Sequence, residues 1–141
     1  MLMPQSLREA CAFCAEQTAI PMAGATDLLV HWPIRPEAQD KTYLDLSAIS
    51  ELRPFRWTDV SLHIGALTTY WDILRDPQTR AEFPLLHEAA RQVGAIQIQS
   101  RGTWAGNIAN GSPAADGVPV LLAYDASVVL TSMAGSREIP L

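Results

Sequence analysis

The chain has 141 residues, which is enough for a domain with its own hydrophobic core. Its composition, 48% hydrophobic and 18% charged, is that of an ordinary globular protein. The formal net charge is -5 and the ten basic residues are scattered, which argues against a nucleic-acid partner because neutralising phosphates needs clustered cations.

The sequence predicts neither a targeting segment nor a membrane span. The N-terminus lacks a basic region, and Arg8 and Glu9 interrupt its apolar residues. No uncharged apolar run reaches the length needed to cross a bilayer. We therefore expect a cytoplasmic protein without membrane insertion.

The first predicted element is a helix that ends near Gln17. Ser6 is followed three residues later by Glu9, which is the pattern of a capping box. Cys11 and Cys14 form a C-A-F-C motif inside this helix, and a redox dithiol is one interpretation. Their helical spacing among apolar residues favours core positions instead, and a redox motif of this kind should follow a strand.

A strand, a short helix and a second strand are predicted next. Residues 19–23 form the first strand, and Gly24 breaks it. Thr26 or Asp27 can cap the short helix, LLVHW, which the following prolines end. Residues 42–47 alternate in polarity and predict the second strand.

The rest of the chain predicts a hairpin, three further helices, a loop and a closing strand, so the fold class is α+β, in two small lobes. In order these are a hairpin of residues 52–57 and 61–66, a helix over 69–74 that Pro77 ends or re-angles, a helix over 83–93, a loop over 103–116, a helix over 118–124 and a strand over 127–131.

The predicted loop, TWAGNIANGSPAAD, consists of small and amide side chains and carries no charge before its last residue. Small side chains let a ligand approach the backbone, and Thr103, Asn107, Asn110 and Ser112 offer donors and acceptors without net charge. The alternative is a glycine-rich connector whose polar residues satisfy their own turns. Structureless connectors of this length are uncommon and are more often functional.

A second glycine-containing turn, MAGATDLL, joins the first strand to the short helix. Such a turn directs backbone N–H groups into one concavity, which suits an anion. No lysine is nearby, so a phosphate would be bound by backbone amides. Asp27 would repel a phosphate, and capping the helix or accepting from a hydroxyl suits it better. Turns of this kind are also common for structural reasons alone, and both nucleotide fingerprints are absent.

Other chemistries have weaker support. His31, His63 and His87 lack the spacing of metal ligands. Ser112 lacks the glycine that a nucleophile elbow requires. Trp104 lies inside the small-residue stretch and is placed to line a ligand pocket.

Taken together, these segments resemble the FAD-binding, or medium, subunit of the xanthine dehydrogenase and carbon monoxide dehydrogenase family of molybdenum hydroxylases. AGATDLL resembles the family's AGGTDLL, and SLHIGALTTYWDI resembles its IGA-x-T segment. The run from FPLLHEAARQVGAIQIQS through RGTWAGNIANGSPAAD to VPVLLAYDASVVL resembles its P-x-L-x-E-A-A … G-T-x-G-G-N-I-x-x-x-S-P-x-A-D segment. Two long motifs in the right order are far more specific than either loop alone.

The resemblance implies a two-lobed FAD-binding domain of the vanillyl-alcohol-oxidase (PCMH) type, with one lobe over about residues 1–50 and the other over about 51–141. FAD would lie between the lobes, and Asp116 would accept from its hydroxyls. No catalytic acid, base or metal ligand on this chain is implied. The implied cofactor-binding residues are Met22, Ala23, Gly24, Ala25, Thr26, Asp27 and Leu28 around the pyrophosphate, and Thr103, Gly106, Asn107, Ile108, Ser112 and Asp116 in the second wall.

The resemblance also implies a function in electron transfer. Substrate would be oxidised at a molybdenum–pterin site on a partner subunit. Electrons would pass through [2Fe–2S] clusters on an iron–sulfur subunit to the FAD held here, and on to NAD+, oxygen or another acceptor. The small-residue stretch would then be uncharged because amides, rather than lysines, neutralise the pyrophosphate.

Departures from the family pattern leave two rival interpretations open. Ala25 and Ala105 stand where the family has glycines, and Gln99 replaces an arginine. A methyl group costs little at negative φ but strains a left-handed position. The ending SREIPL resembles the point where the family continues into a C-terminal domain. The rivals are a stand-alone flavin oxidoreductase and a flavin-free structural or assembly subunit.

Overall fold

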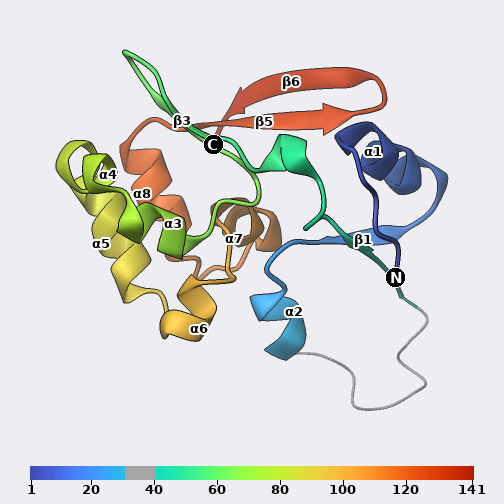
Figure 1. Cartoon of the computed structure of the whole chain (residues 1–141), viewed down its shortest axis with the longest axis horizontal. Coiled ribbons are helices and arrows are strands. Elements are labelled where there is room, and N and C mark those ends of the chain that lie inside the picture. The colour runs from blue at the N-terminus through green and yellow to red at the C-terminus, as the bar shows by residue number, and fades with distance from the viewer. Residues whose placement is uncertain (31–40) are drawn as a thin grey trace.

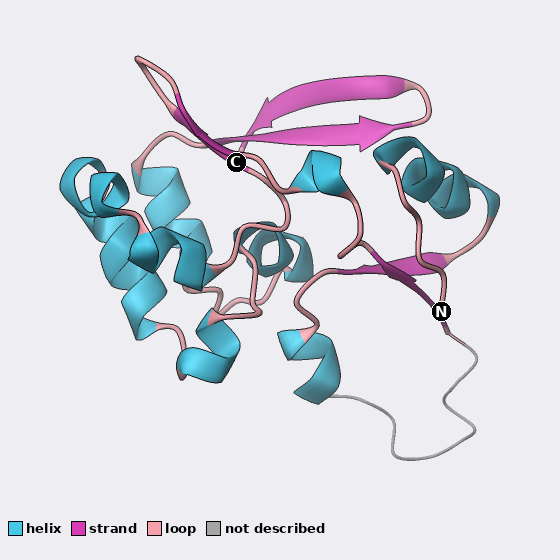
Figure 2. Cartoon of the chain, viewed as in Figure 1, coloured by secondary structure: helices cyan, strands magenta, loops and turns pink. Residues whose placement is uncertain are grey.

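The computed structural model describes residues 1–30 and 41–141, and within them helices and strands are mixed along the chain (Figures 1 and 2). This mixture confirms the predicted α+β class. None of the described helices is long and apolar enough to cross a membrane. The elements are α1 (Leu7–Glu16), β1 (Ala19–Met22), α2 (Thr26–Val30), β2 (Thr42–Asp45), the 3-10 helix η2 (Ser50–Leu52), β3 (Phe55–Trp57), β4 (Leu62–Ile64), α3 (Tyr70–Arg75), α4 (Pro77–Glu82), α5 (Pro84–Gln92), α6 (Ile96–Gln99), α7 (Trp104–Asn110), α8 (Gly117–Ala123), β5 (Ser127–Ser132) and β6 (Gly135–Pro140).

Helix α1 begins at the predicted cap. The Ser6 hydroxyl accepts a hydrogen bond from the Glu9 backbone N–H at 3.2 Å. The Glu9 carboxylate accepts from the Gln5 N–H at 2.8 Å, one residue before the position that a capping box uses. The Ser6 half of the box is therefore confirmed, and the reciprocal half involves Gln5.

The two cysteines of α1 are free thiols, and neither is fully buried. The Cys11 sulfur lies 3.7 Å from the Thr131 carbonyl oxygen of β5. Cys14 is exposed, so the predicted core position is wrong for this residue. Partial burial of its sulfur, together with the neighbouring Cys11, raises the pKa of Cys14, which disfavours the thiolate that redox chemistry requires.

Strands β1 and β2 pair in parallel along their whole length, with α2 following β1. Helix α2 begins at Thr26, so Thr26 and Asp27 lie inside its first turn and not at the capping position that the sequence suggested. The predicted end of this helix, His31 and Trp32, and the prolines after it lie outside the described residues.

The predicted hairpin and the two helices after it form in the middle of the chain, where η2 and α6 were not predicted. Strands β3 and β4 form an antiparallel hairpin with Phe55 opposite Ile64. Thr69 and Asp72 form a complete capping box at the start of α3. Asp76 ends α3 and caps α4, which begins at the proline expected to end or re-angle the helix.

The predicted loop over residues 103–116 is wrong for its first half, because residues 104–110 form α7. The Thr103 hydroxyl caps this helix by accepting from the Gly106 N–H at 3.0 Å. Gly111 ends the helix with a left-handed φ of 61°. Trp104 is 1% exposed and anchors the helix in the core.

The last strand, β6, is an element that the sequence analysis did not predict. It pairs antiparallel with β5, and Gly135 stands at the turn with a φ of 123°. The hairpin extends towards α1, which β5 contacts (Figure 1).

Buried side chains form two clusters. The smaller consists of Ala10, Leu44 and Ile49 and packs α1 onto the parallel strands. The larger joins α3, α5, α7 and α8, and its buried members are Tyr70, Ile73, Leu86, Ala90, Val93, Trp104 and Leu121.

Candidate functional site

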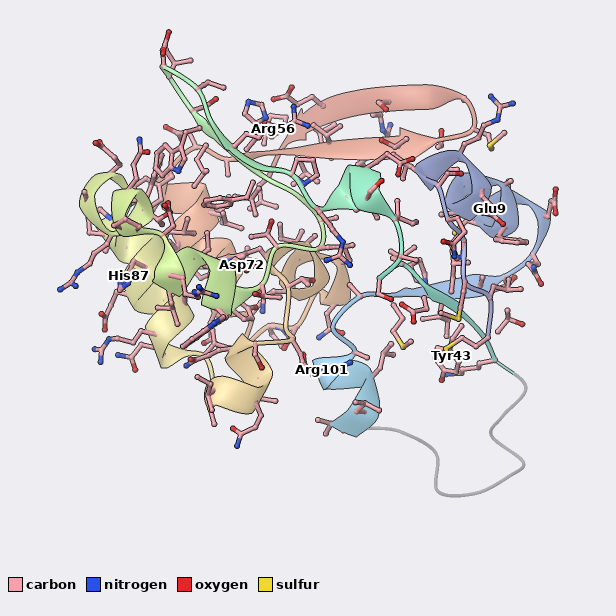
Figure 3. The ribbon with its side chains drawn as sticks, in the orientation of Figure 1. Glu9, Tyr43, Arg56, Asp72, His87 and Arg101 are labelled. Carbon is pink, nitrogen blue, oxygen red and sulfur yellow. The ribbon has the colours of Figure 1, made fainter. Side chains whose placement is uncertain are left out.

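The turn between β1 and α2 packs against the residues that precede α7. Arg101 Nε donates a hydrogen bond to the Gly24 carbonyl oxygen at 3.3 Å. Figure 3 shows Arg101 beside α2. Gly24 has no room for a side chain, because the Arg101 carbonyl group occupies that space. Two segments separated by 77 positions in the sequence are therefore in backbone contact.

A cleft of about 540 Å³ opens between these two segments. This volume falls in the usual range for small-molecule sites. Its lining is mostly small and apolar, and Asp27 is the one charged side chain among the described residues that form it. Such a lining suits a ligand that is held mainly through close backbone contact.

The structure brings most of the predicted site residues together in this cleft. Two predicted residues lie elsewhere. Ile108 packs against the larger core cluster, and Asp116 stands exposed at the start of α8. Those that line the cleft are Met22, Ala23, Gly24, Ala25, Thr26, Asp27, Leu28, Thr103, Gly106, Asn107 and Ser112.

Backbone N–H groups in the first turn are available to a ligand. Those of Ala23, Gly24 and Ala25 donate no hydrogen bond to any described residue. Ala25 has a left-handed φ of 58°, which folds the turn into a concavity. Successive free N–H groups in such a turn attract anions. The geometry therefore fits a phosphate held by amides, as the absence of a nearby lysine suggested.

Polar side chains in the second wall are partly engaged with the backbone. Asn107 Oδ1 accepts from the Gly117 N–H at 3.1 Å, so Asn107 supplies the cap of α8 that Asp116 does not. Ser112 Oγ accepts from the Ala114 N–H at 3.2 Å. The Asn107 amide protons and the Ser112 hydroxyl proton remain to donate to a ligand.

Tyr70 also lines the cleft, and sequence reasoning missed it because it was assigned only to a helix start. Its burial, and then the negative charge of Asp116, raise the pKa of Tyr70 to about 12. The phenol is therefore neutral at physiological pH. Asp116 makes no capping hydrogen bond with its side chain, and it does not line the cleft.

Other lining residues that the sequence did not indicate are apolar or lack a side chain. Val30 lies in α2, Val93 directly follows α5, and Ile98 lies in α6, and nothing in their local sequence marks them. Gly102 was detectable, since it stands directly before the small-residue stretch. A Cβ atom on Gly102 would lie 2.9 Å from Tyr70 Cε2, so the glycine leaves room for that ring.

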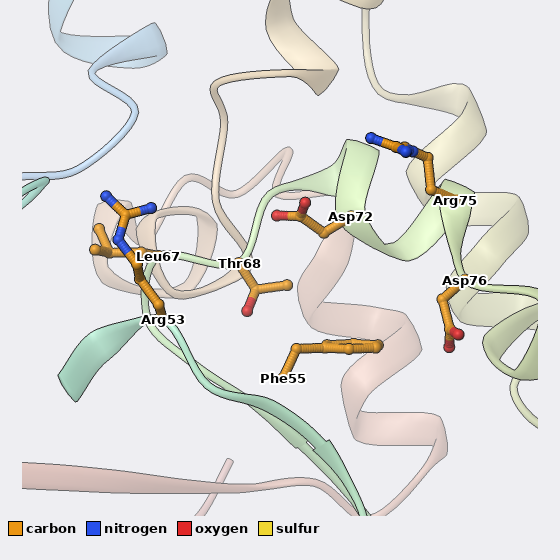
Figure 4. Close-up of a pocket in the computed structure, with 7 residues that line it drawn as sticks. All are labelled: Arg53, Phe55, Leu67, Thr68, Asp72, Arg75 and Asp76. Atoms are coloured by element: carbon orange, nitrogen blue, oxygen red, sulfur yellow. The ribbon is translucent and has the colours of Figure 1, made fainter. Parts of the chain in front are cut away.

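A second hollow of about 470 Å³ contains none of the predicted residues (Figure 4). Its acidic side chains already serve the fold, because Asp72 caps α3 and Asp76 caps α4. Arg53 donates to the Ser47 carbonyl oxygen. The cleft beside Gly24 is therefore the better candidate site.

Comparison with known proteins agrees with this choice. The family model described as the FAD binding domain in molybdopterin dehydrogenase matches residues 1–141. The nicotinate dehydrogenase FAD-subunit of Eubacterium barkeri is 37% identical over 141 residues, which cover 98% of this chain and 47% of that protein. The carbon monoxide dehydrogenase medium chain of Hydrogenophaga pseudoflava is 35% identical over 139 residues, covering 97% of this chain and 48% of the relative.

Solved structures share the fold. Carbon monoxide dehydrogenase from Hydrogenophaga pseudoflava superposes with a TM-score of 0.91 at 35% identity, covering 99% of this chain and 49% of that chain. The fold implied by the resemblance is thereby confirmed. The chain spans about half the length of the relatives it matches. With the family model matching from end to end, this chain belongs to the family of FAD-binding domains in molybdopterin dehydrogenases.

Proposed function

We propose that this chain is the FAD-binding, electron-transferring part of a molybdenum-containing hydroxylase or dehydrogenase, and thus part of an oxidoreductase. The observation that carries the proposal is the cleft between residues 22–28 and α7, in a chain that belongs to an FAD-binding family. The relatives named above are an FAD subunit and a medium chain of dehydrogenases, which supports the same role here.

The chain's own residues bind and orient the cofactor. The free N–H groups of Ala23, Gly24 and Ala25 would hold the pyrophosphate, and the small residues of α7 would let the dinucleotide lie against the backbone. Asp116, which stands outside the cleft lining at the start of α8, would accept from FAD hydroxyls. FAD would supply the redox chemistry when it is bound, and we assign no catalytic acid or base to residues 1–30 or 41–141.

The two core clusters correspond in this proposal to the two lobes, with the division near residue 50 and FAD between them. Substrate is oxidised on a molybdenum–pterin subunit, and an iron–sulfur subunit with [2Fe–2S] clusters delivers electrons to the flavin. NAD+, oxygen or another acceptor then receives them, in the cytoplasm.

The test is the visible absorption spectrum of the protein purified from its host with any subunits that accompany it. Mass analysis of the released small molecule and metal analysis of the complex complete it. FAD together with molybdenum and iron is the expected result. FAD without either metal would favour a stand-alone flavin oxidoreductase. No flavin, even after FAD is added, would overturn the proposal in favour of a structural or assembly subunit.

A further inference from the structure

Tyr70 stands at the junction of the two cleft walls. Its backbone N–H donates to the Gly102 carbonyl oxygen at 3.2 Å. Its ring packs edge-on against Trp104, with 5.0 Å between the ring centroids. The residue is only 3% exposed, yet it lines the cleft. The ring is therefore fixed by the core while part of the side chain faces the ligand space.

The hydroxyl of Tyr70 has no hydrogen-bond partner among the described residues. Tyr124 offers a contrast, because its hydroxyl accepts from the Leu85 N–H at 3.1 Å. The fully buried side-chain atoms without a partner, in the part of the chain that the structure describes, are Thr68 Oγ1 and Trp104 Nε1. Tyr70 Oη is not one of them, so this hydroxyl is not fully buried, and its residue lines the cleft. A fixed phenol with a free O–H is a donor prepared for a ligand.

The protonation state of this hydroxyl suits an anionic acceptor. Burial and the charge of Asp116 raise the pKa of Tyr70 to about 12, so the O–H proton is retained across the physiological range. Asp116 itself accepts no hydrogen bond from Tyr70. The proton is free to be donated to another oxygen.

The backbone around Gly102 brings Tyr70 close to the Gly24 turn. A Cβ atom on Gly24 would lie 3.1 Å from Gly102 Cα, and a Cβ atom on Gly102 would lie 2.9 Å from Tyr70 Cε2. The Tyr70 ring and the Gly24 turn are thus neighbours across a single residue. Tyr70 and the residues of that turn whose N–H groups are free line the same cleft.

We infer that Tyr70 Oη donates a hydrogen bond to a pyrophosphate oxygen of the dinucleotide bound in the cleft. This inference rests on the proposed function, because it takes FAD as the ligand. It assigns a binding role to a residue outside the MAGATDLL turn and outside the small-residue stretch over 103–116. The bond adds a phenol donor beside the free backbone amides of Ala23, Gly24 and Ala25.

The experiment compares the wild type with Tyr70→Phe and with Tyr124→Phe, each in its natural complex freed of flavin. FAD and ADP are titrated separately, because ADP carries the pyrophosphate without the flavin ring. The Tyr70→Phe variant keeps the ring that packs on Trp104, so the thermal midpoint of the flavin-free protein should be unchanged. Both FAD and ADP should bind about tenfold more weakly or worse, since hydrogen bonds to charged groups are among the stronger ones.

Tyr124→Phe is the matched control, because it removes a phenol hydroxyl that bonds outside the cleft. It should lower stability and leave the affinity for FAD and ADP unchanged. Equal binding by wild type and Tyr70→Phe would overturn the inference and leave the proposed function standing. Weaker binding of FAD with unchanged binding of ADP would do the same. A wild-type protein that binds no FAD would overturn both, which distinguishes the two failures.

Discussion

Gly24 and Arg101 touch through their backbones so closely that a Cβ atom on residue 24 would lie 1.8 Å from the Arg101 carbonyl oxygen. Replacing Gly24 with alanine must push the two cleft walls apart, because the obstacle is backbone. We expect the free energy of unfolding to fall by about 2 kcal/mol, the usual cost of overpacking, and FAD to bind more weakly. Urea unfolding and flavin titration measure the two effects.

Gly65→Ala is the control for this variant. A Cβ atom there would lie 2.5 Å from the Leu52 carbonyl oxygen, which is a similar backbone clash outside the cleft. It should lower stability without changing the affinity for FAD. An equal loss of affinity in both variants would show that the Gly24 contact has no special role in the site.

Ala25 and Ala105 should respond in opposite ways to glycine. Ala25 has a left-handed φ of 58°, where a side chain costs about 1 kcal/mol, so Ala25→Gly should stabilise the protein by roughly that amount. Ala105 lies within α7, where glycine costs about 1 kcal/mol relative to alanine. Thermal unfolding of the two variants checks both signs, and a gain from Ala105→Gly would contradict the helix.

Thr103 should contribute to stability through its cap on α7. Thr103→Val keeps the branched shape but removes the oxygen that accepts from the Gly106 N–H, so unfolding free energy should drop by about 1 kcal/mol. Thr103→Ser retains that oxygen and should stay much closer to the wild type. Denaturant unfolding measures the free energy of both variants. Equal losses of stability in the two would assign the effect to packing and not to the capping hydrogen bond.

Asp76 should make stability depend on pH in the acidic range. Partial burial opposes its charge, but hydrogen bonds from Thr79, Trp57 and Gln78 together outweigh that effect and lower its pKa below the ordinary 3.8. Its contribution is therefore fully present above the unfolded-state pKa and is lost as pH falls through the lower folded-state pKa.

Asp76→Asn tests this dependence, because asparagine retains a capping oxygen without the charge. The wild type should be the more stable at neutral pH. The difference in unfolding free energy should shrink as the pH falls from the unfolded-state pKa of Asp76 through its lower folded-state pKa. Urea unfolding over a pH series measures it. A difference that stays constant down to acid pH would mean that the carboxylate charge is not what stabilises the cap.

Local patterns in the sequence predicted the elements whose ends are fixed by their own residues. The cap at Ser6 and the change of helix at Pro77 are examples, because each helix start depends on hydrogen bonds made within a few positions. Helix α7 was missed because glycine and asparagine are poor helix formers. Its cap at Thr103 and the burial of Trp104 outweigh that preference, and burial cannot be read from spacing alone.

The sequence likewise predicted part of the candidate site and missed the rest. The two glycine-containing segments were recognisable as motifs, and their small residues indicated close backbone contact. Tyr70 was not, since its place in the cleft depends on the pairing of Thr69 with Thr103 and on the missing side chain of Gly102. Ile108 belongs to the motif but packs into the core, so membership of a motif does not distinguish a wall residue from a supporting one.

Residues 101–103 are held from both sides, by the Gly24 turn and by the start of α3. The Tyr70 N–H is bound to the Gly102 carbonyl oxygen, and the Trp104 N–H to that of Thr68, at 3.2 Å each. Opening either bond requires this segment to move, and a ligand in the cleft would oppose that motion. Deuterium uptake at these two amides should consequently slow when a ligand fills the cleft. The two amides would therefore report whether the cleft is occupied.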